Sequence, residues 1–390
     1  MTIVPCQAKT TTFYQLLEQT PGLDGRDNRG KPVRRCGHTT AMILTGLVLA
    51  LCCGRDGKLS SLHRHMVNHF EPLCAATQQG HKKPISRAQL PLLLAKVNGT
   101  LFAKLLFEWL GWTLDADQKR WFALDGKELR GSIEPGQKRG QACVSALVHD
   151  SEVIAGQVYY SGTKESECLT VRQLLNECGL YGQKITLDAL HLKPLTVNAI
   201  HGAGGVYLIG VKANQACLYR YCICHSLMQE TVFSRLDAPQ RGHGRLENRS
   251  YSCFSIPATA PAVRWKDAGL ATLIQVRRSR QELEGSLSRE EISYFVSNRA
   301  VHSQQLAEEL FDAIRHHWRI EAMHHRRDVT LAEDALQTGN QAISRLMSSL
   351  RTLTLGLLAK AKPKNMAAQV EGFADKFHTL IQFMTQEMVL

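Results

Sequence analysis

The order of strand-like and helix-like segments between residues 121 and 211 constrains the fold of this chain more strongly than any other feature. Short apolar runs bounded by Gly, Pro and charged residues are typical of β-strands, whereas longer amphipathic stretches are typical of helices. Three strand-like runs come first, at Trp121–Leu124, Ala142–Val148 and Val153–Tyr159. A helix near Ser166–Cys178, a strand at Lys184–Leu187, a helix near Leu192–His201 and a strand at Val206–Val211 follow. We therefore expect three antiparallel strands, then strands joined through helices.

This order is the connectivity of an RNase H-like fold of the α/β class, in which a mixed sheet carries helices on both faces. In the helix near 166–178, we expect Leu169, Leu174 and Leu175 to face the sheet. Between 214 and 300 the pattern departs from this plan. Further strands are predicted there at Arg249–Phe254, Leu273–Val276 and Ile292–Val296. We interpret this region as a strand-rich insertion with at least one strand rejoining the main sheet.

The two ends of the chain are predicted to be helical. The run Ala41–Cys53 is almost wholly apolar, but its thirteen residues fall short of the roughly 20 that span a bilayer, and it begins too late for a signal peptide. It is predicted to be a buried helix, and no membrane partner is expected. Near the other end, a helix over Gln341–Lys362 is stopped by Pro363. A last helix, Met366–Leu390, has an apolar face suited to packing or to homodimer formation.

These observations divide the chain into five consecutive parts. They are a helical N-terminal domain (1–115), the first part of the core (116–213), the insertion (214–300), a returning core segment with the helix of Glu321 (301–340) and the C-terminal helices (341–390).

The charge balance favours a partner made of phosphates. Lys and Arg outnumber Asp and Glu by 47 to 35, which gives a formal charge of +12. In the N-terminal domain, Ser86 and Gln89 have capping-box spacing, so a helix is predicted to start there and to end before Asn98–Gly99. Lys82, Lys83 and Arg87 make that helix a candidate DNA-binding helix-turn-helix; the alternative is a bundle helix that packs on the next domain. A basic turn with Arg241 and Arg245 is a second candidate DNA contact.

The cysteines do not predict a metal site or disulfides. There are twelve, and no C-x-x-C pair occurs among them. They are typical of reduced thiols in a cytosolic protein. The cluster of Cys222, Cys224 and His225 lacks a second pair of ligands at zinc-site spacing.

Three carboxylates are the candidate catalytic residues. Asp125 ends the first predicted strand and Asp188 the fourth, and these strands are neighbours in an RNase H-like sheet. Glu321 lies on a later helix with His317 and His325 four residues away on either side, hence on the same face. Three acidic groups in one pocket repel one another unless a cation lies between them. Oxygen ligands predict Mg²⁺ or Mn²⁺, and two ions would activate the attacking group and stabilise the leaving oxygen of a phosphodiester.

Basic residues near the carboxylates are predicted to hold the DNA backbone or the developing charge. They are Lys127, Arg130, His191, His325 and Arg327. Each part of the pattern also has a plain structural interpretation: a lone Asp after a strand is commonly a turn residue, and a charge-rich helix is commonly a solvated surface. The three acids in this order, in a basic protein, favour the catalytic interpretation.

Several ordered motifs resemble those of a known family. They are A-L-D-G-K-E-L-R-G-S, T-L-D-A-L-H with G-G-V-Y-L-I-G-V-K-A-N-Q behind it, R-G-H-G-R-L-E-N-R, and H-W-R-I-E-A-M-H-H-R-R-D-V-T-L-A-E-D followed by G-N. Over nearly the whole chain they resemble the ISAs-one type of bacterial insertion-sequence transposase, also met as H-repeat-associated proteins.

The resemblance implies a DDE transposase with an RNase H-like core, an insertion before the final Glu, and magnesium-dependent cleavage and joining of transposon ends. By motif position, Asp125, Asp188 and Glu321 correspond to the catalytic triad. It also implies double-stranded DNA as partner, both transposon ends and target, and a bacterial cytoplasmic protein associated with the nucleoid. Lys164 and Glu167 match a K-x-x-E stretch of the family, whose role the sequence does not give.

The chain departs from the wider group of insertion-sequence transposases at one motif. Ile314, His317 and Asp328 stand where that group has Tyr, Arg and Lys around the Glu. The departure removes the basis for inferring a hairpin-forming excision step, but not for the metal chemistry. Two alternatives stay open: a transposase-derived DNA-binding or regulatory protein without turnover, and a nuclease put to another use.

Overall fold

A computed structural model describes most of the chain. The described residues are 11–24, 38–54, 56–80, 83–110, 118–151, 153–161, 164–242, 244–258, 263–282, 288–387 and 389–390. Lys82, one of the predicted DNA contacts, lies outside them.

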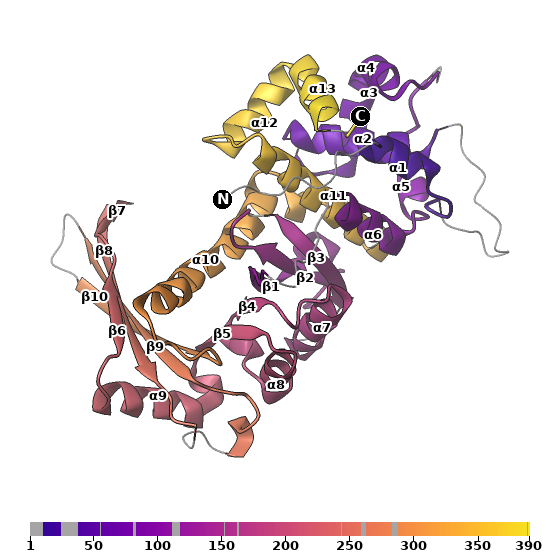
Figure 1. The fold of residues 1–390 in the computed structure, drawn as a ribbon. Helices are drawn as coiled ribbons and strands as arrows, with labels where there is room; N and C mark the ends of the chain where they lie inside the picture. Colours follow the sequence, from indigo (N-terminus) through magenta and orange to yellow (C-terminus); the bar gives the residue numbers. More distant parts are fainter. Residues whose placement is uncertain are drawn as a thin grey trace.

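The centre of the molecule is a mixed sheet (Figure 1). Its core strands are β1 (Trp121–Leu129), β2 (Gln141–Val148), β3 (Ile154–Ser161), β4 (Lys184–Leu187) and β5 (Val206–Val211), in the order β3-β2-β1-β4-β5. Strands β1, β2 and β3 are antiparallel, while β4 runs parallel to both β1 and β5. The predicted succession of strands and helices is therefore confirmed, as is the mixed sheet.

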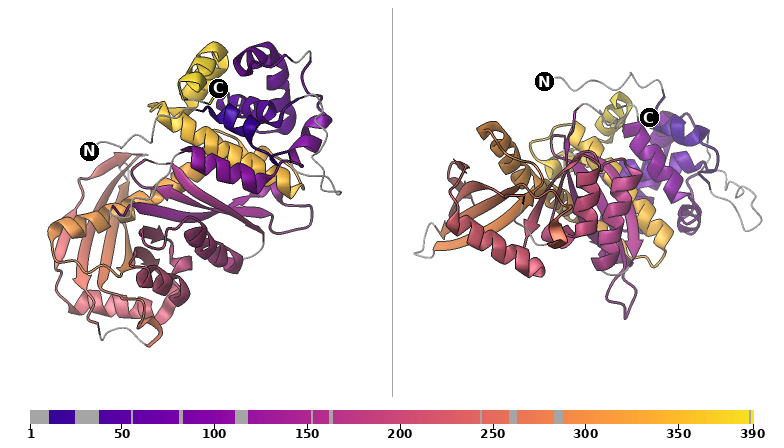
Figure 2. Two further views of the ribbon diagram at one scale, coloured as in Figure 1. Left: turned by 45° about the vertical axis from the view of Figure 1, so that its right-hand side comes forward. Right: turned by 60° about the horizontal axis from the view of Figure 1, so that its bottom comes forward.

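Helices cover both faces of these strands, as predicted (Figure 2). One face carries α7 (Lys164–Glu177) and α8 (Pro194–Gly202), and the other carries α10 (Gln304–Val329) and α11 (Gln341–Lys360). Because side chains alternate along a strand, Phe122 packs into the core on the α7 side and Ala123 into the core on the other. In α7, Leu174 is buried as predicted, whereas Leu169 is 60% exposed; its expected place is taken by Val171.

The insertion continues the central sheet instead of forming a separate one. Its strands are β6 (Phe233–Leu236), β7 (Gln240–Gly242), β8 (Arg245–Ser255), β9 (Thr272–Glu282) and β10 (Ser288–Ser297). Strand β10 pairs antiparallel with β5, and the order then runs β10-β9-β8-β6, with β7 paired to β8. The predicted return of a strand to the main sheet is thus confirmed. A helix that the sequence analysis missed, α9 (Ala216–Met228), packs Leu218 and Cys222 into the same core as α7.

The helices from both ends of the chain share one hydrophobic core. They are α1 (Phe13–Gln19), α2 (Thr40–Cys52), α3 (Leu59–Asn68), α4 (Phe70–Thr77), α5 (Gln89–Leu94) and α6 (Gly99–Leu110) from the first part, and α11, α12 (Met366–Asp375) and α13 (Phe377–Gln386) from the last. As predicted, α2 is buried along its whole length. In the part of the chain that the structure describes, no helix is long and apolar enough to cross a membrane.

Two predictions for these terminal helices are wrong in detail. The helix expected from Ser86 to Val97 is only α5, because the chain turns after Leu94. Asn98 then caps α6, its side-chain oxygen accepting a hydrogen bond from the backbone N–H of Leu101 at 3.1 Å. The last helix is broken at Lys376 into α12 and α13, and its apolar face is used for internal packing: Leu380 and Met384 are fully buried.

A buried ionic network joins the end of α10 to the strands and to α11. Arg327, 0% exposed, donates to Glu333 Oε1 and to Ser348 Oγ, both at 2.5 Å. Glu333 starts the short 3₁₀ helix η5 (Glu333–Ala335), and its other oxygen lies 3.9 Å from Lys127 Nζ of β1. Buried charges of this kind are costly to separate, because a lost partner leaves an uncompensated charge in a medium of low dielectric constant.

We predict that Glu333→Gln lowers the free energy of unfolding at pH 7 by about 3–5 kcal/mol, since Arg327 then stays buried without its counter-charge. Urea denaturation measures this difference. Glu290→Gln is the matched control, because it breaks a surface pair with Arg277 at 2.8 Å in which both side chains are about half exposed. That change is expected to cost less than about 1 kcal/mol. Equal effects of the two substitutions would contradict the prediction.

The same variant gives a pH prediction. Burial raises the pKa of Glu333, but the charges of Arg327 and Arg351 and the hydrogen bond from Arg327 outweigh burial and lower the pKa below its usual value. A carboxyl with a depressed pKa in the folded state contributes stability above its unfolded pKa of about 4.3, and that stability is lost as the pH falls through the folded value. We expect the stability difference between wild type and Glu333→Gln to shrink below about pH 4. A constant difference from pH 7 to pH 3 would contradict this.

Candidate active site

Asp125 and Asp188 lie level with each other on neighbouring strands. Strand β1 is longer than predicted, so Asp125 is an interior strand residue opposite Ser145 of β2 and not a strand end. The parallel register of β1 and β4 pairs Ala123 with Thr186. Two residues further along each chain, Asp125 comes level with Asp188, which directly follows the last residue of β4. The two predicted aspartates are therefore brought together.

Asp125 points to the side of the sheet on which α10 lies. Its Oδ2 is 3.5 Å from Nδ1 of His324, a residue of α10. Burial raises the pKa of Asp125, but the hydrogen bond with His324 and the charges of His324 and His317 outweigh burial and lower the pKa. Asp125 is thus held ionised at neutral pH. The sequence analysis missed His324, although it lies one helical turn after Glu321.

Glu321 is an exposed residue of α10, and the charges of both aspartates affect its pKa. Burial of its carboxyl and the charges of Asp125 and Asp188 raise the pKa of Glu321, while Lys212 lowers it. The mutual repulsion means that the three carboxylates share one electrostatic environment. Lys212, exposed directly after β5, was also missed; it lies in the G-V-K-A-N-Q motif.

In the observed side-chain conformations the three carboxylates do not form a metal site. Among the described residues, no three His, Cys, Asp or Glu side chains are close enough together to hold a metal ion. Asp125 is occupied by His324, and Asp188 Oδ1 accepts a hydrogen bond from the backbone N–H of Leu190 at 2.9 Å. Their oxygen donors have the chemistry that Mg²⁺ or Mn²⁺ requires.

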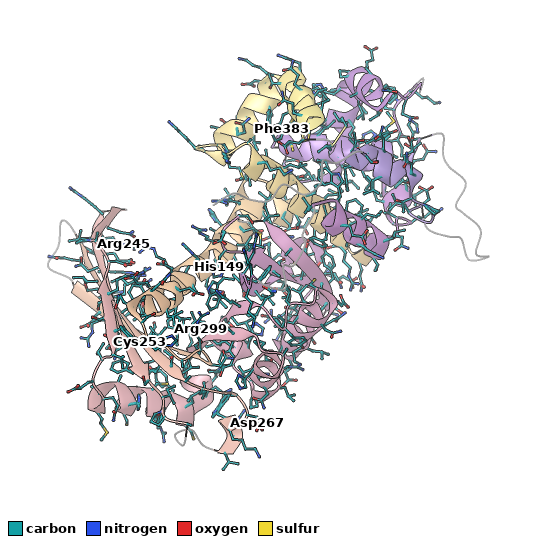
Figure 3. The ribbon with its side chains drawn as sticks, in the orientation of Figure 1. His149, Arg245, Cys253, Asp267, Arg299 and Phe383 are labelled. Carbon is teal, nitrogen blue, oxygen red and sulfur yellow. The ribbon has the colours of Figure 1, made fainter. Side chains whose placement is uncertain are left out.

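A second group of residues fixes His317, a residue of α10, against the sheet. His317 Nδ1 is 3.0 Å from the hydroxyl oxygen of Thr186, and His149 Nε2 is 3.1 Å from the same oxygen. His149 lies beside α10 (Figure 3). Burial and the neighbouring charges of His317, His316 and Arg319 lower the pKa of His149 to about 3. Burial also lowers the pKa of His317, against the charges of Asp125 and Asp188. Both rings are therefore neutral at pH 7.

His191 is not the DNA contact that the sequence predicts. It is 1% exposed and lies in η2 (Ala189–His191), which Asp188 caps. Its Nε2 is 3.2 Å from Glu167 Oε1 and 3.7 Å from Asp188 Oδ1. Burial lowers the pKa of His191, but hydrogen bonds with Cys168 and Glu167 and the charge of Asp188 outweigh burial and raise the pKa to about 9. It is a buried cation beside Asp188, out of reach of a DNA backbone.

Lys127 and Arg327 are likewise structural in this arrangement, which corrects their predicted contact with DNA. Lys127 is 7% exposed, and its Nζ is 2.6 Å from Asp328 Oδ1 of α10. Arg327 is enclosed by its partners Glu333 and Ser348. Each cation already has a carboxylate partner within the protein, so neither has a free face to offer a phosphate.

The other predicted DNA contacts in the described part of the chain are exposed. Arg130 lies in η1 (Arg130–Ser132), where its Nε is 4.0 Å from Asp334 Oδ2 and its backbone N–H donates to Asp334 Oδ1 at 3.3 Å. His325 lies one turn beyond Glu321. Lys83 and Arg87 precede α5, which packs against α11, so the packing interpretation of that helix fits the structure while both side chains stay accessible. Arg241 and Arg245 lie on the β7–β8 hairpin, and Arg245 lies at the outer end of the insertion (Figure 3).

No known protein-family profile matches the chain. Individual relatives do match it. "Putative transposase YncI" of Escherichia coli O157:H7 is 27% identical over 281 residues, which cover 69% of this chain and 70% of the relative. "H repeat-associated putative transposase YhhI" of Escherichia coli K12 is 26% identical over 273 residues, 67% of this chain and 70% of the relative.

A third relative has the same kind of name: "H repeat-associated putative transposase YbfD" of Escherichia coli K12, 28% identical over 162 residues, which cover 40% of this chain and 64% of the relative. The relatives agree with the family that the sequence motifs indicate. Over about two thirds of its length the chain is similar to proteins named putative transposases, among them an H repeat-associated one.

Proposed function

We propose that this protein is a DDE transposase that cleaves phosphodiester bonds at transposon ends and transfers the released strand to target DNA. The observation that supports the proposal best is that Asp125 and Asp188 both act electrostatically on Glu321. They come from two strands and a helix far apart in the sequence, and the charges of both aspartates raise the pKa of Glu321. Three mutually repelling carboxylates are unfavourable in a purely structural role, and a shared cation would relieve their repulsion.

The strand order of the sheet is consistent with this proposal. We interpret β3-β2-β1-β4-β5, with α7 and α8 on one face and α10 on the other, as an RNase H-like core. In that arrangement the carboxyl end of β4 lies beside the middle of β1, and α10 closes the site from above. Loops around this rigid core can then supply the contacts with DNA.

The metal would be Mg²⁺ or Mn²⁺, with two ions held by Asp125, Asp188 and Glu321. When bound, it supplies activation of the attacking water or hydroxyl and stabilisation of the leaving oxygen. The protein's own contribution is to hold the ligands. His324 holds the pKa of Asp125 below its usual value, and His317 of α10 is fixed against the end of β4 by Thr186.

DNA is proposed to approach the exposed side of α10. Arg130, His325 and Lys212 are exposed around the carboxylates, and the net charge of +12 attracts a polyanion at long range. The β7–β8 hairpin, and Lys83 and Arg87 before α5, are proposed further contacts with the backbone of double-stranded DNA. Such a substrate implies work at the nucleoid in the bacterial cytoplasm, and paired transposon ends would favour a homodimer.

We predict that Asp125→Asn, Asp188→Asn and Glu321→Gln each reduce cleavage of DNA with the flanking terminal repeats by at least about 10²-fold. Each removes a negative ligand while keeping the shape of the side chain. DNA binding measured with a chelator present is expected to stay within about threefold of wild type, because no positive charge is lost. A gel-based cleavage and strand-transfer assay with magnesium, manganese or chelator measures the effect.

The assay also separates the proposal from its rivals. Cleavage that persists in any one variant removes that residue from the triad. A wild type that binds DNA but does not cleave in either metal is a transposase-derived binding protein instead. Cleavage without strand transfer, with all three carboxylates required, is a nuclease put to another use.

We further predict that the double variant Arg241→Ala/Arg245→Ala weakens DNA binding and reduces the slope of log K against log salt by about 2, since two phosphate contacts are lost. Filter binding over a range of salt concentrations measures the slope. Lys104→Ala is the control, because Lys104 is an exposed residue of α6. Helix α6 and the β7–β8 hairpin lie on opposite sides of the molecule (Figure 1). An unchanged slope in the double variant would mean that the hairpin does not touch the backbone.

A further inference from the structure

Glu167, in the first turn of α7, is tied to the candidate site although the proposed chemistry does not use it. Its Oε1 lies 3.2 Å from Nε2 of His191, and its Oε2 accepts a hydrogen bond from the hydroxyl of Tyr160 on β3 at 3.1 Å. The side chain is only 17% exposed. Both carboxylate oxygens are therefore engaged by neighbours from different elements, which fixes the orientation of the group.

Glu167 also lies directly against the backbone beside Asp125. A Cβ added to Gly126 would stand 2.6 Å from Cδ and 2.7 Å from Oε1 of Glu167, closer than side-chain atoms pack. Gly126 does not have the left-handed backbone that only glycine favours, so its lack of a side chain serves this contact. Because neighbouring residues of a strand face opposite ways, Asp125 points to α10 while Gly126 faces Glu167.

The same carboxylate reaches Asp188 through one intermediary. His191 Nε2 lies between the two acids, 3.2 Å from Glu167 and 3.7 Å from Asp188 Oδ1. The backbone N–H of His191 donates to the carbonyl of Asp188 at 3.2 Å, which closes the turn that holds both residues. Glu167 thus meets the strand of one aspartate directly and the side chain of the other through a histidine.

We propose that Glu167 is a positioning residue of this site: through His191 and Gly126 it sets the relative placement of Asp188 and Asp125. The inference rests on the proposed metal chemistry. It assigns a role to the Glu of the K-x-x-E stretch. Residues that orient metal ligands without touching the metal change affinity or activity by about 10–100-fold when they are substituted.

Mn²⁺ binding to the full-length protein, followed by the electron paramagnetic resonance signal of the free ion, tests the proposal without needing turnover. Glu167→Gln is expected to weaken Mn²⁺ binding by about 10-fold or more, and cleavage at subsaturating metal falls in proportion. Its thermal midpoint is expected to fall, because the buried His191 loses a counter-charge, so binding is measured at a temperature at which both proteins are folded. Its metal-free DNA binding is expected to stay close to that of wild type. Glu165→Gln is the matched control, because it makes the same change at an exposed position of the same helix and should leave Mn²⁺ binding unchanged.

A double-substitution cycle tests the contact with β1. Gly126→Ala is expected to weaken Mn²⁺ binding in the wild-type background, because the new methyl group displaces Glu167. Added to Glu167→Ala, the same change should have little further effect, since the displaced group is already gone. Additive effects of the two substitutions would overturn the proposed link through Gly126.

The remaining outcomes separate this inference from the proposed function. Unchanged Mn²⁺ affinity with a lowered thermal midpoint in Glu167→Gln would make Glu167 purely structural and overturn the inference alone. A loss of Mn²⁺ as complete as in Asp188→Asn would make Glu167 a direct ligand, and positioning would be wrong. A wild type whose Mn²⁺ binding is the same as that of Asp188→Asn would overturn the proposed function and, with it, the inference.

Discussion

Repulsion among the carboxylates of Asp125, Asp188 and Glu321 is the constraint on which the rest of this structure depends. Each acid raises the free energy of ionising its neighbours, so a fold that gathers them has to hold β1, the end of β4 and α10 together against that repulsion. The groups that do this are inside the protein: the ring of His324 lies beside Asp125, and the cation of His191 lies beside Asp188. These two histidines therefore stabilise the carboxylates of Asp125 and Asp188 before any metal binds.

The attachment of α10 to β1 depends on the buried ionic network. Lys127, two residues after Asp125, pairs with Asp328, seven residues after Glu321. Lys127 also lies 3.9 Å from Glu333, which is the partner of Arg327. A shift of α10 along β1 would separate these charges in a low-dielectric interior, which costs several kcal/mol. The departure at Asp328 from the Lys of the wider transposase group has a local consequence here: the acid accepts the cation of β1, so the position holds the helix instead of offering a charge to DNA.

Much of the core was predictable, because the local sequence of each strand or helix indicates its type. The strands at Lys184–Leu187 and Val206–Val211 have the predicted bounds, since short apolar runs between turn residues leave little choice. Asp125 was placed at a strand end because polar residues follow Leu124, yet β2 on one side pairs with β1 as far as Leu129. Helix α9 was missed because its cysteines and tyrosines have no clear period; its burial depends on strands distant in sequence.

The supporting residues of the site were harder to predict than the acids themselves, for a physical reason. An acid that follows a buried strand is unusual from its neighbours alone. Arg327, by contrast, differs from the partly buried Arg326 beside it through its partners Glu333 and Ser348. A charged side chain is buried only where it has an oppositely charged or hydrogen-bonding partner, and the tertiary structure determines which residue that partner is. The sequence therefore identifies residues that act on a substrate better than it identifies residues that hold the first kind in place. Glu167 is of the second kind, because the role that we propose for it depends on its contacts with Gly126 and His191, which come from other elements of the fold.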